Sequence, residues 1–448
     1  KNILIMINKK YFFIGIGGIG MSAIAQYLHD KGNTVFGYDK TNNRTIEILL
    51  NKGIGITNKL DLEEIPQDIM GEDLEIVYTP AIKKENIYLN YFITNGKNKI
   101  SKRSEILGEI TKDSKCIAVA GTHGKTTTTA IISDLFYSYG LKFKAFVGGI
   151  MKGYNSNYLY TGDDYIIVEA DEYDKSFLNL SPDYAVITSL ECDHLDIYGN
   201  FESLKKSFNL FSENVKNTLV AEEEINIKRD FTFSIKNDAN YLASNIITKN
   251  DGIVFDFKTP DNYFTNIYVK IIGMHNLKNV LSALSIIDQI NEIEIADLLP
   301  FLSNLKGIER RMEIYRIDDK IVIDDYAHHP TEIESVFSAI NNNYKNKSTS
   351  VIFQPHLFSR TRDFMEDFAI VLSKFDEVYL LDIYPAREKP IDGINSQVLL
   401  DKISSSKKEI VNKESINDII INSGTEVISI LGAGNISENL NKKIFTNE

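Results

Sequence analysis

The sequence predicts an α/β protein of three domains, each built on a largely parallel β-sheet. At 448 residues the chain is long enough for two to four domains. Short apolar runs alternate with helical stretches along the chain, which is the pattern of parallel sheets covered by helices. Several of the runs end in glycine-rich turns or polar clusters, where such sheets bind ligands. We place the domains at 1–112, 113–307 and 308–448.

Composition narrows the class of function. The chain is 43% hydrophobic and 25% charged, which is typical of a globular protein with an ample core. Its formal net charge of −13 argues against nucleic-acid binding, which needs a basic face. Local cations such as Lys125, Arg310 and Arg311 can still bind an anionic substrate.

Cysteine content and hydropathy indicate a soluble, cytoplasmic protein. Cys116 and Cys192 are too few for a disulfide framework or a cysteine zinc site, and both lie in apolar, strand-like runs, so we expect them in the core. Residues 11–28, "YFFIGIGGIGMSAIAQYL", are uncharged and long enough to span a bilayer. Four glycines at 15–20 break this stretch into strand, turn and helix, so we expect no stable membrane association.

The first domain begins with a strand, a glycine turn, a helix ending at Gly32 and a second strand, which together predict a Rossmann-like βαβ unit. The turn reads Gly15-x-Gly17-Gly18-x-Gly20, and its amides can approach a diphosphate closely. Asp39 follows Gly20 by nineteen residues, where such folds place an acid against a ribose hydroxyl. A tight turn without a ligand is the alternative interpretation.

The second domain opens with "AVAGTHGKTTTTA" at 118–130, between a short strand and a helix that ends at Gly140. The common phosphate-binding P-loop has four residues between its first glycine and Gly-Lys, whereas only two residues separate Gly121 from Gly124. The amides of 121–126 can still wrap a phosphate, with Lys125 supplying charge and Thr126 a hydroxyl for Mg²⁺. The stretch predicts an ATP-binding P-loop domain.

Acids and a histidine follow the next strands of this domain. Glu169 ends "YIIVEA" and is a natural Mg²⁺ ligand. His194, in "ECDHLD", is either a further ligand or a satisfied polar residue, because magnesium prefers oxygen. Such a concentration of carboxylates predicts more than one Mg²⁺, since the charges would otherwise repel one another. The other acids concerned are Asp171, Glu172, Asp174, Asp193 and Asp196.

The end of the second domain shows a change of pattern. Residues 231–272 alternate in polarity, with a turn signal at 250–252, and predict antiparallel strands added to the central sheet. A helix follows over 273–290. Asn276 and Asn279 lie one turn apart at its start, where they either cap the helix or contact an adenine.

The third domain contains four apolar strands, within 320–330, 348–363, 376–386 and 425–437, and a helix predicted over 361–375, which suggests a second Rossmann-like sheet. Arg310 or Arg311 could reach a γ-phosphate from just before these strands. Polar residues on the loops suggest a site that handles an amine or a carboxylate. These residues are Asp325, Tyr326, His328, His329, His356, Arg360 and Arg362.

Together these motifs resemble the Mur ligases of peptidoglycan synthesis. They occur in order over nearly the whole chain as "GIGGIGMS", "GTHGKTTTT", "EADEYD", "ECDHLDIYG", "GMHNLKN", "ERR", "DDYAHHPTE", "QPHLFSRTRD", "DIYPARE" and "LGAGNI". The shortened glycine-lysine loop is itself a signature of the family. The resemblance implies that the first domain holds UDP, the second ATP and Mg²⁺, and the third L-alanine.

The resemblance also implies a role for individual residues. The catalytic set is Lys125, Glu169, His194, Arg311 and Asp325. The metal ligands are Thr126, Glu169 and His194. The ATP site comprises Gly121, Thr122, His123, Gly124, Lys125, Thr126, Thr127, Asn276 and Asn279. The UDP site comprises Gly15, Gly17, Gly18, Ile19, Gly20, Met21, Ser22 and Asp39, and the amino-acid site Tyr326, His328, His356 and Arg360.

The implied reaction joins L-alanine to UDP-N-acetylmuramate through an acyl phosphate, in a monomer or homodimer. Leu357 and Met312 depart from the family pattern in the third domain, as does Thr79-Pro80 in the first. One alternative is the sibling ligase that attaches a whole tripeptide to the same sugar nucleotide in murein recycling. Others are an NAD-binding oxidoreductase or regulatory module built on residues 11–39, and an inactive, scaffold-like homologue.

Overall fold

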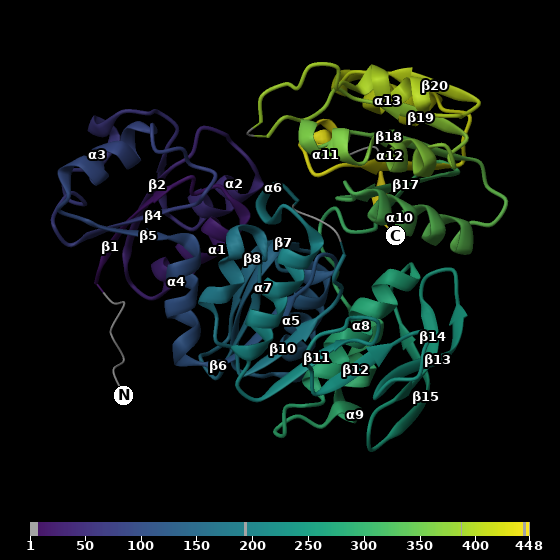
Figure 1. The fold of residues 1–448 in the computed structure, drawn as a ribbon, viewed down its shortest axis with the longest axis horizontal. Helices are drawn as coiled ribbons and strands as arrows, with labels where there is room; N and C mark the ends of the chain where they lie inside the picture. Colours follow the sequence, from purple (N-terminus) through teal and green to yellow (C-terminus); the bar gives the residue numbers. More distant parts are fainter. Residues whose placement is uncertain (1–7, 192–194, 387, 442–444, 448) are drawn as a thin grey trace. The chain divides into compact units, whose positions relative to one another are not determined.

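The computed structural model describes residues 8–191, 195–386, 388–441 and 445–447 (Figure 1). Two compact units make up the chain. The first consists of Lys1–Asn245, Phe255–Ile267 and Lys278–Gly307 and contains the N-terminal sheet. The second consists of Ile246–Val254, Tyr268–Leu277 and Ile308–Glu448 and contains the C-terminal sheet. None of the helices among the described residues combines the length and apolar character needed to cross a bilayer.

The N-terminal sheet confirms the predicted βαβ unit. Its strand order is β3-β2-β1-β4-β5, and every pair is parallel. The strands are β1 (Lys10–Ile14), β2 (Thr34–Tyr38), β3 (Gly55–Thr57), β4 (Leu74–Tyr78) and β5 (Lys99–Lys102). The helices are α1 (Ile19–Asp30), α2 (Arg44–Asn51), α3 (Ile87–Asn95) and α4 (Arg103–Ile110). The order reverses at β1, so its glycine turn lies at the switch point where such sheets bind ligands.

The central sheet has the order β15-β14-β13-β12-β11-β10-β6-β9-β7-β8. Its strands are β6 (Lys115–Ala120), β7 (Phe143–Met151), β8 (Ser156–Tyr160), β9 (Tyr165–Glu169), β10 (Tyr184–Ile187), β11 (Thr218–Glu222), β12 (Phe231–Ser234), β13 (Tyr241–Thr248), β14 (Ile253–Lys258) and β15 (Tyr263–Val269). Its helices are α5 (Lys125–Tyr139), α6 (Leu195–Tyr198), α7 (Phe201–Glu213), α8 (Met274–Ile287) and α9 (Ile295–Leu298).

The prediction of antiparallel strands over 231–272 is wrong for β12. β12 pairs parallel with both β11 and β13, because the chain crosses over between these strands and does not turn back on itself. An antiparallel pair does occur, at β7 and β8 on the opposite side of the sheet. The expected turn at 250–252 is present, where the Lys249 amide donates to the Gly252 carbonyl at 2.8 Å.

The C-terminal sheet has the order β20-β19-β18-β21-β17-β16-β22. Its strands are β16 (Glu313–Ile317), β17 (Lys320–Asp325), β18 (Thr349–Phe353), β19 (Glu377–Leu380), β20 (Lys407–Ile410), β21 (Val427–Leu431) and β22 (Thr446–Asn447). Its helices are α10 (Pro330–Asn343), α11 (Phe358–Asp363), α12 (Met365–Leu372), α13 (Ser396–Lys402) and α14 (Ile416–Asn422). The four predicted strands are therefore present. The single helix expected over 361–375 is wrong, since α11 and α12 break at Phe364, whose φ of −114° leaves the helical range.

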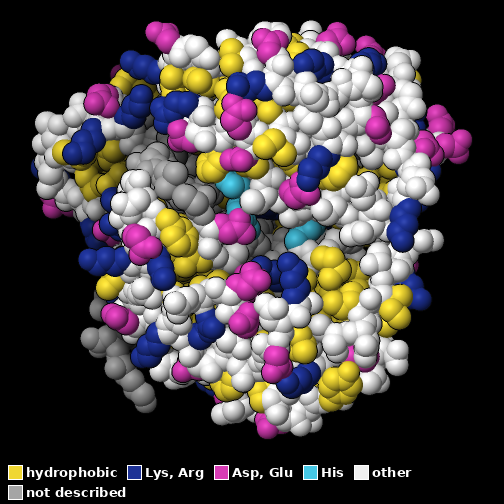
Figure 2. Space-filling view, turned by 45° about the vertical axis from the view of Figure 1, so that its right-hand side comes forward, with side chains coloured by type: hydrophobic (Ala, Val, Ile, Leu, Met, Phe, Trp, Pro, Cys, Tyr) yellow, Lys and Arg dark blue, Asp and Glu magenta, His cyan; other side chains and the backbone are white. Residues whose placement is uncertain are grey.

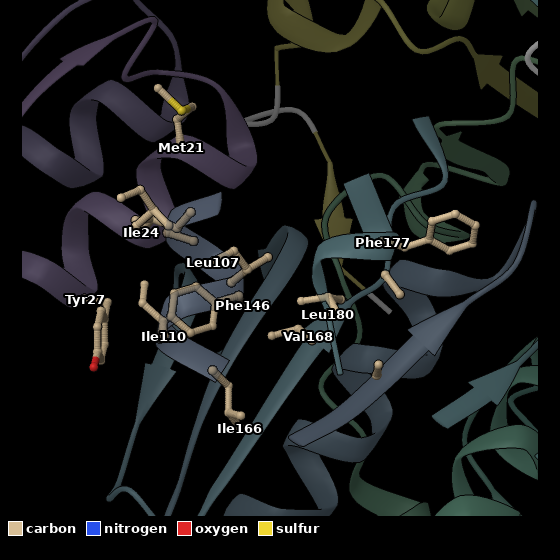
Figure 3. Packing of buried hydrophobic residues seen from close by; sticks show 14 of the residues in the cluster. Met21, Ile24, Tyr27, Leu107, Ile110, Phe146, Ile166, Val168, Phe177 and Leu180 are labelled. Atoms are coloured by element: carbon tan, nitrogen blue, oxygen red, sulfur yellow. The ribbon is translucent and has the colours of Figure 1, made fainter. Parts of the chain in front are cut away.

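One hydrophobic core joins the first two sheets within the first unit (Figure 3). It receives side chains from α1, α4, β7, β9 and the segment after β9. The side chains labelled in Figure 3 are Met21, Ile24, Tyr27, Leu107, Ile110, Phe146, Ile166, Val168, Phe177 and Leu180, and all are buried. Cys116 is buried as predicted, whereas Cys192 lies outside the described residues.

A buried polar cluster also ties α1 to β8. Asn157 is fully buried, and its Nδ2 donates to Ser22 Oγ at 2.9 Å and to the Ile19 carbonyl at 2.5 Å. Its Oδ1 accepts from Gln26 Nε2 at 2.9 Å. Because each polar atom of this amide has a partner, the cluster fixes the position of α1 on the central sheet without a desolvation penalty.

Candidate functional site

The shortened loop of residues 121–124 follows β6 and leads into α5. Gly121 and Gly124 have φ values of 136° and 83°, which disfavour any residue with a side chain. A Cβ on Gly121 would overlap Thr188 Oγ1, and a Cβ on Gly124 would overlap Asn279 Oδ1. The two glycines of the motif are thus required by both backbone conformation and space.

The end of β10 supports this loop. Ser189 accepts from the His123 amide at 2.8 Å through its hydroxyl and from the Thr122 amide at 3.1 Å through its carbonyl. Thr188 Oγ1 donates to the carbonyl of Ala120 at 3.1 Å. Since β10 pairs parallel with β6, both strands deliver these residues to the same edge of the sheet. Hydrogen bonds from the end of β10 therefore hold the loop in a defined shape.

Lys125, the first residue of α5, is turned into the loop. Its Nζ donates to the Gly121 carbonyl at 2.5 Å and lies 2.8 Å from Glu172 Oε2. Glu172 is fully buried. Burial alone would lower the pKa of the Lys125 ammonium, but Glu172, with Asp171 and Glu169, raises that pKa above its ordinary value. Lys125 is therefore positively charged, and the Glu172 carboxylate neutralises that charge.

The two predicted magnesium ligands described by the structure lie side by side. Thr126 Oγ1 donates to Glu169 Oε2 at 3.0 Å, and the Gly148 amide donates to Glu169 Oε1. A hydroxyl and a carboxylate are the oxygen donors that Mg²⁺ prefers, so these side chains fit that ion. Among the residues that the structure describes, no three His, Cys, Asp or Glu side chains form a ready set of metal ligands. His194 lies outside the described residues.

The repulsion that suggested several Mg²⁺ ions is relieved within the protein itself. Asp171 pairs with Arg103 at 3.2 Å, and Asp174 with Lys102 at 3.3 Å. Glu172 pairs with Lys125, as described above. Three of the five crowded acids thus have cationic partners, so charge repulsion no longer requires more than one metal ion. Asp193 and the side chain of Asp196 lie outside the described residues.

The glycine turn of the first domain, residues 15–20, is braced by Asp39. Asp39 Oδ2 accepts from the Gly17 amide at 2.9 Å, and Oδ1 accepts from the Thr41 amide at 3.0 Å. The carboxylate therefore holds the turn together, and its contact with a ribose stays a prediction. Gly15 has a φ of 85°, which favours glycine.

The side chains that follow the turn face inward. Met21 and Ser22 are buried in the core beside the central sheet, so only backbone groups of these two residues are available to a ligand. Ile19 begins α1, and Gly18 precedes it as the N-cap. The amides at the start of this helix are the groups that would face an anion.

Sequence reasoning missed Arg103. Its Nη1 lies 2.8 Å from the position that a Cβ on Gly20 would occupy, so the guanidinium packs directly against the last glycine of the turn. The same guanidinium pairs with Asp171 beside the ATP loop. The basic pair Lys102-Arg103 at the end of β5 was the available signal, because the carboxyl ends of parallel strands meet at one edge.

In the second unit, the two neighbouring arginines serve different purposes. Arg310 Nη1 donates to the Gly434 carbonyl at 2.9 Å, its Nη2 donates to the Gly432 carbonyl, and its Nε lies 3.3 Å from Asp324 Oδ1. It therefore fastens the turn before β16 to the segment after β21. Both guanidinium groups lie over the Tyr326 ring, that of Arg310 at 5.3 Å and that of Arg311 at 5.0 Å. Because backbone carbonyls hold Arg310, Arg311 is the better candidate of the two for chemistry.

Asp325 ends β17 in a buried position. Its Oδ2 accepts from the Met312 amide at 2.6 Å and its Oδ1 from the Ala327 amide at 2.8 Å. Burial raises the pKa of this carboxyl to about 6, and it outweighs Arg311 and the two amides, which lower the pKa. Asp325 can therefore change its protonation state close to neutral pH.

The predicted amino-acid site forms a row of rings in the second unit. The ring centroids of Tyr326 and His328 are 5.4 Å apart, and those of His328 and His356 are 5.8 Å apart. Tyr384 continues the row by stacking on His356 at 5.7 Å, and its individual role was not predicted. Arg360 is buried in α11, one turn along from His356 in sequence.

Two residues of the loop prediction have local roles instead. His329 caps the start of α10 through its side chain and contacts the Phe364 ring at 4.6 Å. Arg362 pairs with the adjacent Asp363 at 2.7 Å. Because its side chain caps α10, His329 has a structural role and need not contact the amino acid.

The two asparagines of α8 make different contacts. Asn276 Nδ2 donates to the Ile272 carbonyl at 2.9 Å, which is not a helix cap, because a capping side chain accepts from a helix amide. Both interpretations of Asn276 stay predictions. Asn279 presents its Oδ1 to Gly124 of the ATP loop. Its contact with an adenine stays a prediction, as does the position of Thr127 in the ATP site.

Charged side chains of both signs are interspersed over the face drawn in Figure 2.

Comparisons with known families cover nearly the whole chain. The description "Mur ligase family, catalytic domain" matches residues 10–115, "Mur ligase middle domain" residues 119–287, and "Mur ligase, glutamate ligase domain" residues 310–433. A UDP-N-acetylmuramate–L-alanine ligase of Christiangramia forsetii is 44% identical over 440 residues, which is 97% of this chain and 96% of the relative. The protein of that name from Flavobacterium psychrophilum is 44% identical over 95% of each chain.

Solved structures of ligases with related names have the same fold. The UDP-N-acetylmuramate–alanine ligase of Thermotoga maritima matches with a TM-score of 0.82 and 26% identity, over 96% of this chain and 97% of that one. A murein peptide ligase of Psychrobacter arcticus has the same fold, with a TM-score of 0.71 at 21% identity over 98% of each chain.

Proposed function

The chain belongs to the Mur ligase family, and we propose that it is the ligase that joins L-alanine to the lactyl carboxylate of UDP-N-acetylmuramate with consumption of ATP. Full-length identity of 44% to ligases of that name supports the substrates. The observation that carries the chemistry is the preformed loop 121–124, with Lys125 at its centre and Thr126 and Glu169 beside it.

The reaction has two steps. A lactyl carboxylate oxygen attacks the γ-phosphorus of ATP, a new O–P bond forms, and the P–O bond to ADP breaks. The alanine nitrogen then attacks the acyl carbon, the bond to phosphate breaks, and the amine loses a proton as the amide forms. Activation of the carboxylate is needed because a carboxylate and an amine do not condense directly in water.

Residues of the first unit act on the phosphates. The amides of the loop orient the outer phosphates, and Lys125 must leave Glu172 to place its charge on them. Thr126 and Glu169 would hold Mg²⁺ together with His194. That ion supplies charge neutralisation on the phosphate oxygens when bound.

Residues of the second unit serve the amino acid. We assign its binding to Tyr326, His328, His356 and Arg360, whose rings and guanidinium are of the right chemistry for a small zwitterion. An α-amine has a pKa of about 8, so the site must favour its neutral form. Arg311 and Asp325 complete the proposed catalytic set, with Arg311 acting on phosphoryl charge.

Phosphate release from ATP tests this function. The purified enzyme is supplied with UDP-N-acetylmuramate, Mg²⁺ and one amino acid at a time, with the L-alanine-containing tripeptide as a separate arm. L-Alanine should support release and the tripeptide should not. Release with the tripeptide alone would show the murein-recycling activity instead, and hydride transfer to NAD without ATP consumption would show an oxidoreductase.

A further inference from the structure

Arg103 lies at the junction of the first two sheets, and the register of the N-terminal sheet explains why. Ile14 pairs with Tyr78, and Tyr78 pairs with Lys102, so the last residues of β1, β4 and β5 form one row. The residues that follow leave the sheet at the same edge. The glycine turn after β1 and Arg103 after β5 are therefore brought together by topology, although they are more than eighty residues apart in sequence.

The contact between them is close. Besides Nη1, the Cδ and Cζ atoms of Arg103 lie 3.2 and 3.4 Å from the position of a Cβ on Gly20. The side chain thus lies flat against the start of α1, with a fifth of its surface exposed. A guanidinium at the amide-rich start of a helix adds a full charge beside the partial positive charge of the helix end.

A small hollow lies between Arg103 and Glu169. Arg103, Glu169 and Asp171 line it on the polar side. Leu107, Phe177 and Leu180, labelled in Figure 3, give it an apolar side. The only cationic side chain among its described lining residues is therefore Arg103.

Arg103 forms an ion pair with a side chain of the protein itself. Its Nη2 lies 3.2 Å from Asp171 Oδ2, while Asp171 Oδ1 accepts from the Tyr173 amide at 3.1 Å. Asp174 and Lys175, which follow, have φ values of 53° and 57°, a strained conformation for residues other than glycine. The carboxylate that contacts Arg103 thus comes from a loop with two such residues further along, and an anion with better geometry can compete with it.

We propose that Arg103 is a further substrate-binding residue, which holds the diphosphate of the UDP-sugar against the glycine turn and exchanges Asp171 for it. The proposal rests on the proposed function, since it takes a UDP-sugar as the ligand of this turn. A guanidinium can bind two phosphate oxygens through a pair of parallel hydrogen bonds. Asp171 meets Arg103 through Oδ2, while its Oδ1 accepts from the Tyr173 amide, so the Asp171 carboxylate uses this paired geometry only in part.

Binding measured by titration calorimetry on the full chain tests the proposal. Arg103→Ala should weaken UDP-N-acetylmuramate about 10- to 100-fold, the loss expected for charge-assisted hydrogen bonds. UDP-N-acetylglucosamine, which has the diphosphate but no lactyl carboxylate, should weaken by the same factor. Arg103→Lys should give an intermediate loss, because it keeps the charge without the planar fork.

Two further variants sharpen the test. Asp171→Asn keeps an acceptor for the Tyr173 amide but removes the competing charge, so it should tighten both ligands about two- to fivefold. Lys102→Gln removes a neighbouring cation that pairs with Asp174, and it should change neither affinity by more than about twofold.

Three results would overturn the proposal: wild-type affinity in Arg103→Ala, an equal loss in Lys102→Gln, or a loss confined to UDP-N-acetylmuramate, which would assign Arg103 to the carboxylate. Thermal unfolding of each variant checks that the fold is intact. If the wild-type enzyme binds both UDP-sugars but releases no phosphate with L-alanine, the proposed function fails while these binding results still decide the role of Arg103.

Discussion

Replacing Lys125 by methionine should damage both stability and catalysis, for reasons that can be separated. Lys125 Nζ lies 2.8 Å from Glu172, whose side chain is fully buried. Removing one partner of a buried ion pair leaves an uncompensated charge and costs about 3–5 kcal/mol. Because 16% of the Lys125 side chain is exposed, we expect the lower end of this range. At roughly 2–4 °C per kcal/mol, the melting temperature of the first unit should fall by about 6–12 °C.

The double variant Lys125→Met with Glu172→Gln separates the two effects. It replaces the ion pair by neutral side chains of similar size, so stability should return to within about 1–2 kcal/mol of the wild type. Phosphate release should remain about 10²–10³-fold slower, because the charge on the phosphates is still missing. Differential scanning calorimetry and the phosphate-release assay measure the two quantities on the same samples.

pH provides an internal check. The pKa of Lys125 is raised, so the pair contributes fully below the unfolded-state pKa near 10.4 and is lost only at higher pH. In Lys125→Met, the isolated Glu172 carboxyl can take up a proton in acid, so the deficit in melting temperature should be smaller at pH 5 than at pH 8. A single variant that melts with the wild type, or a double variant as unstable as the single one, would refute this account.

Three further outcomes follow from the geometry. Gly124→Ala should abolish measurable ATP binding, since its Cβ would overlap Asn279. Gly140 has a similar φ of 85° with free space around it, so Gly140→Ala should lower the free energy of unfolding by only about 1–2 kcal/mol and leave ATP binding intact. Nucleotide titration of both variants compares them directly. The Asp325 carboxyl has a pKa of about 6 in the folded chain and about 4 in the unfolded chain, so the folded chain holds an extra proton between these pH values. The free energy of unfolding should therefore fall by about 3 kcal/mol as the pH rises from about 4 to about 6. Asp325→Asn should lose this pH dependence, measured by urea titration at each pH. Asn157→Ala should leave buried partners unsatisfied and lower the free energy of unfolding by about 1–3 kcal/mol, measured in the same way, whereas an unchanged midpoint would contradict the role given to this cluster.

Local sequence patterns predicted the elements that carry the site. The glycines of 121–124 identify the ATP loop because both their conformation and their spacing are set by the turn itself. The strand, turn and helix around Gly15–Gly20 were equally predictable, since each depends on neighbours within a few residues. Pairings such as Lys125 with Glu172 were not, because they join segments that only the strand order brings together.

Identical residue types at adjacent positions show the same limit. Arg310 and Arg311 cannot be told apart by motif, but a φ of 58° turns Arg310 into the C-terminal sheet, where backbone carbonyls hold it. His328 and His329 likewise have different contacts, because His329 caps α10 whereas His328 lies beside the His356 ring. For such pairs, backbone direction decides which contacts each side chain makes, and sequence alone does not contain that direction.

The acidic segment after β9 shows how one sequence pattern can have two physical causes. Its three acids, Asp171, Glu172 and Asp174, suggest metal binding, because like charges need compensation. In the structure, Asp171 and Glu172 compensate one cation each, Arg103 beside the glycine turn and Lys125 inside the ATP loop. Both cations are the ones expected to meet substrate phosphates. If Arg103 binds the UDP-sugar as proposed, one short acidic segment therefore positions both phosphate-binding cations, Arg103 through Asp171 and Lys125 through Glu172.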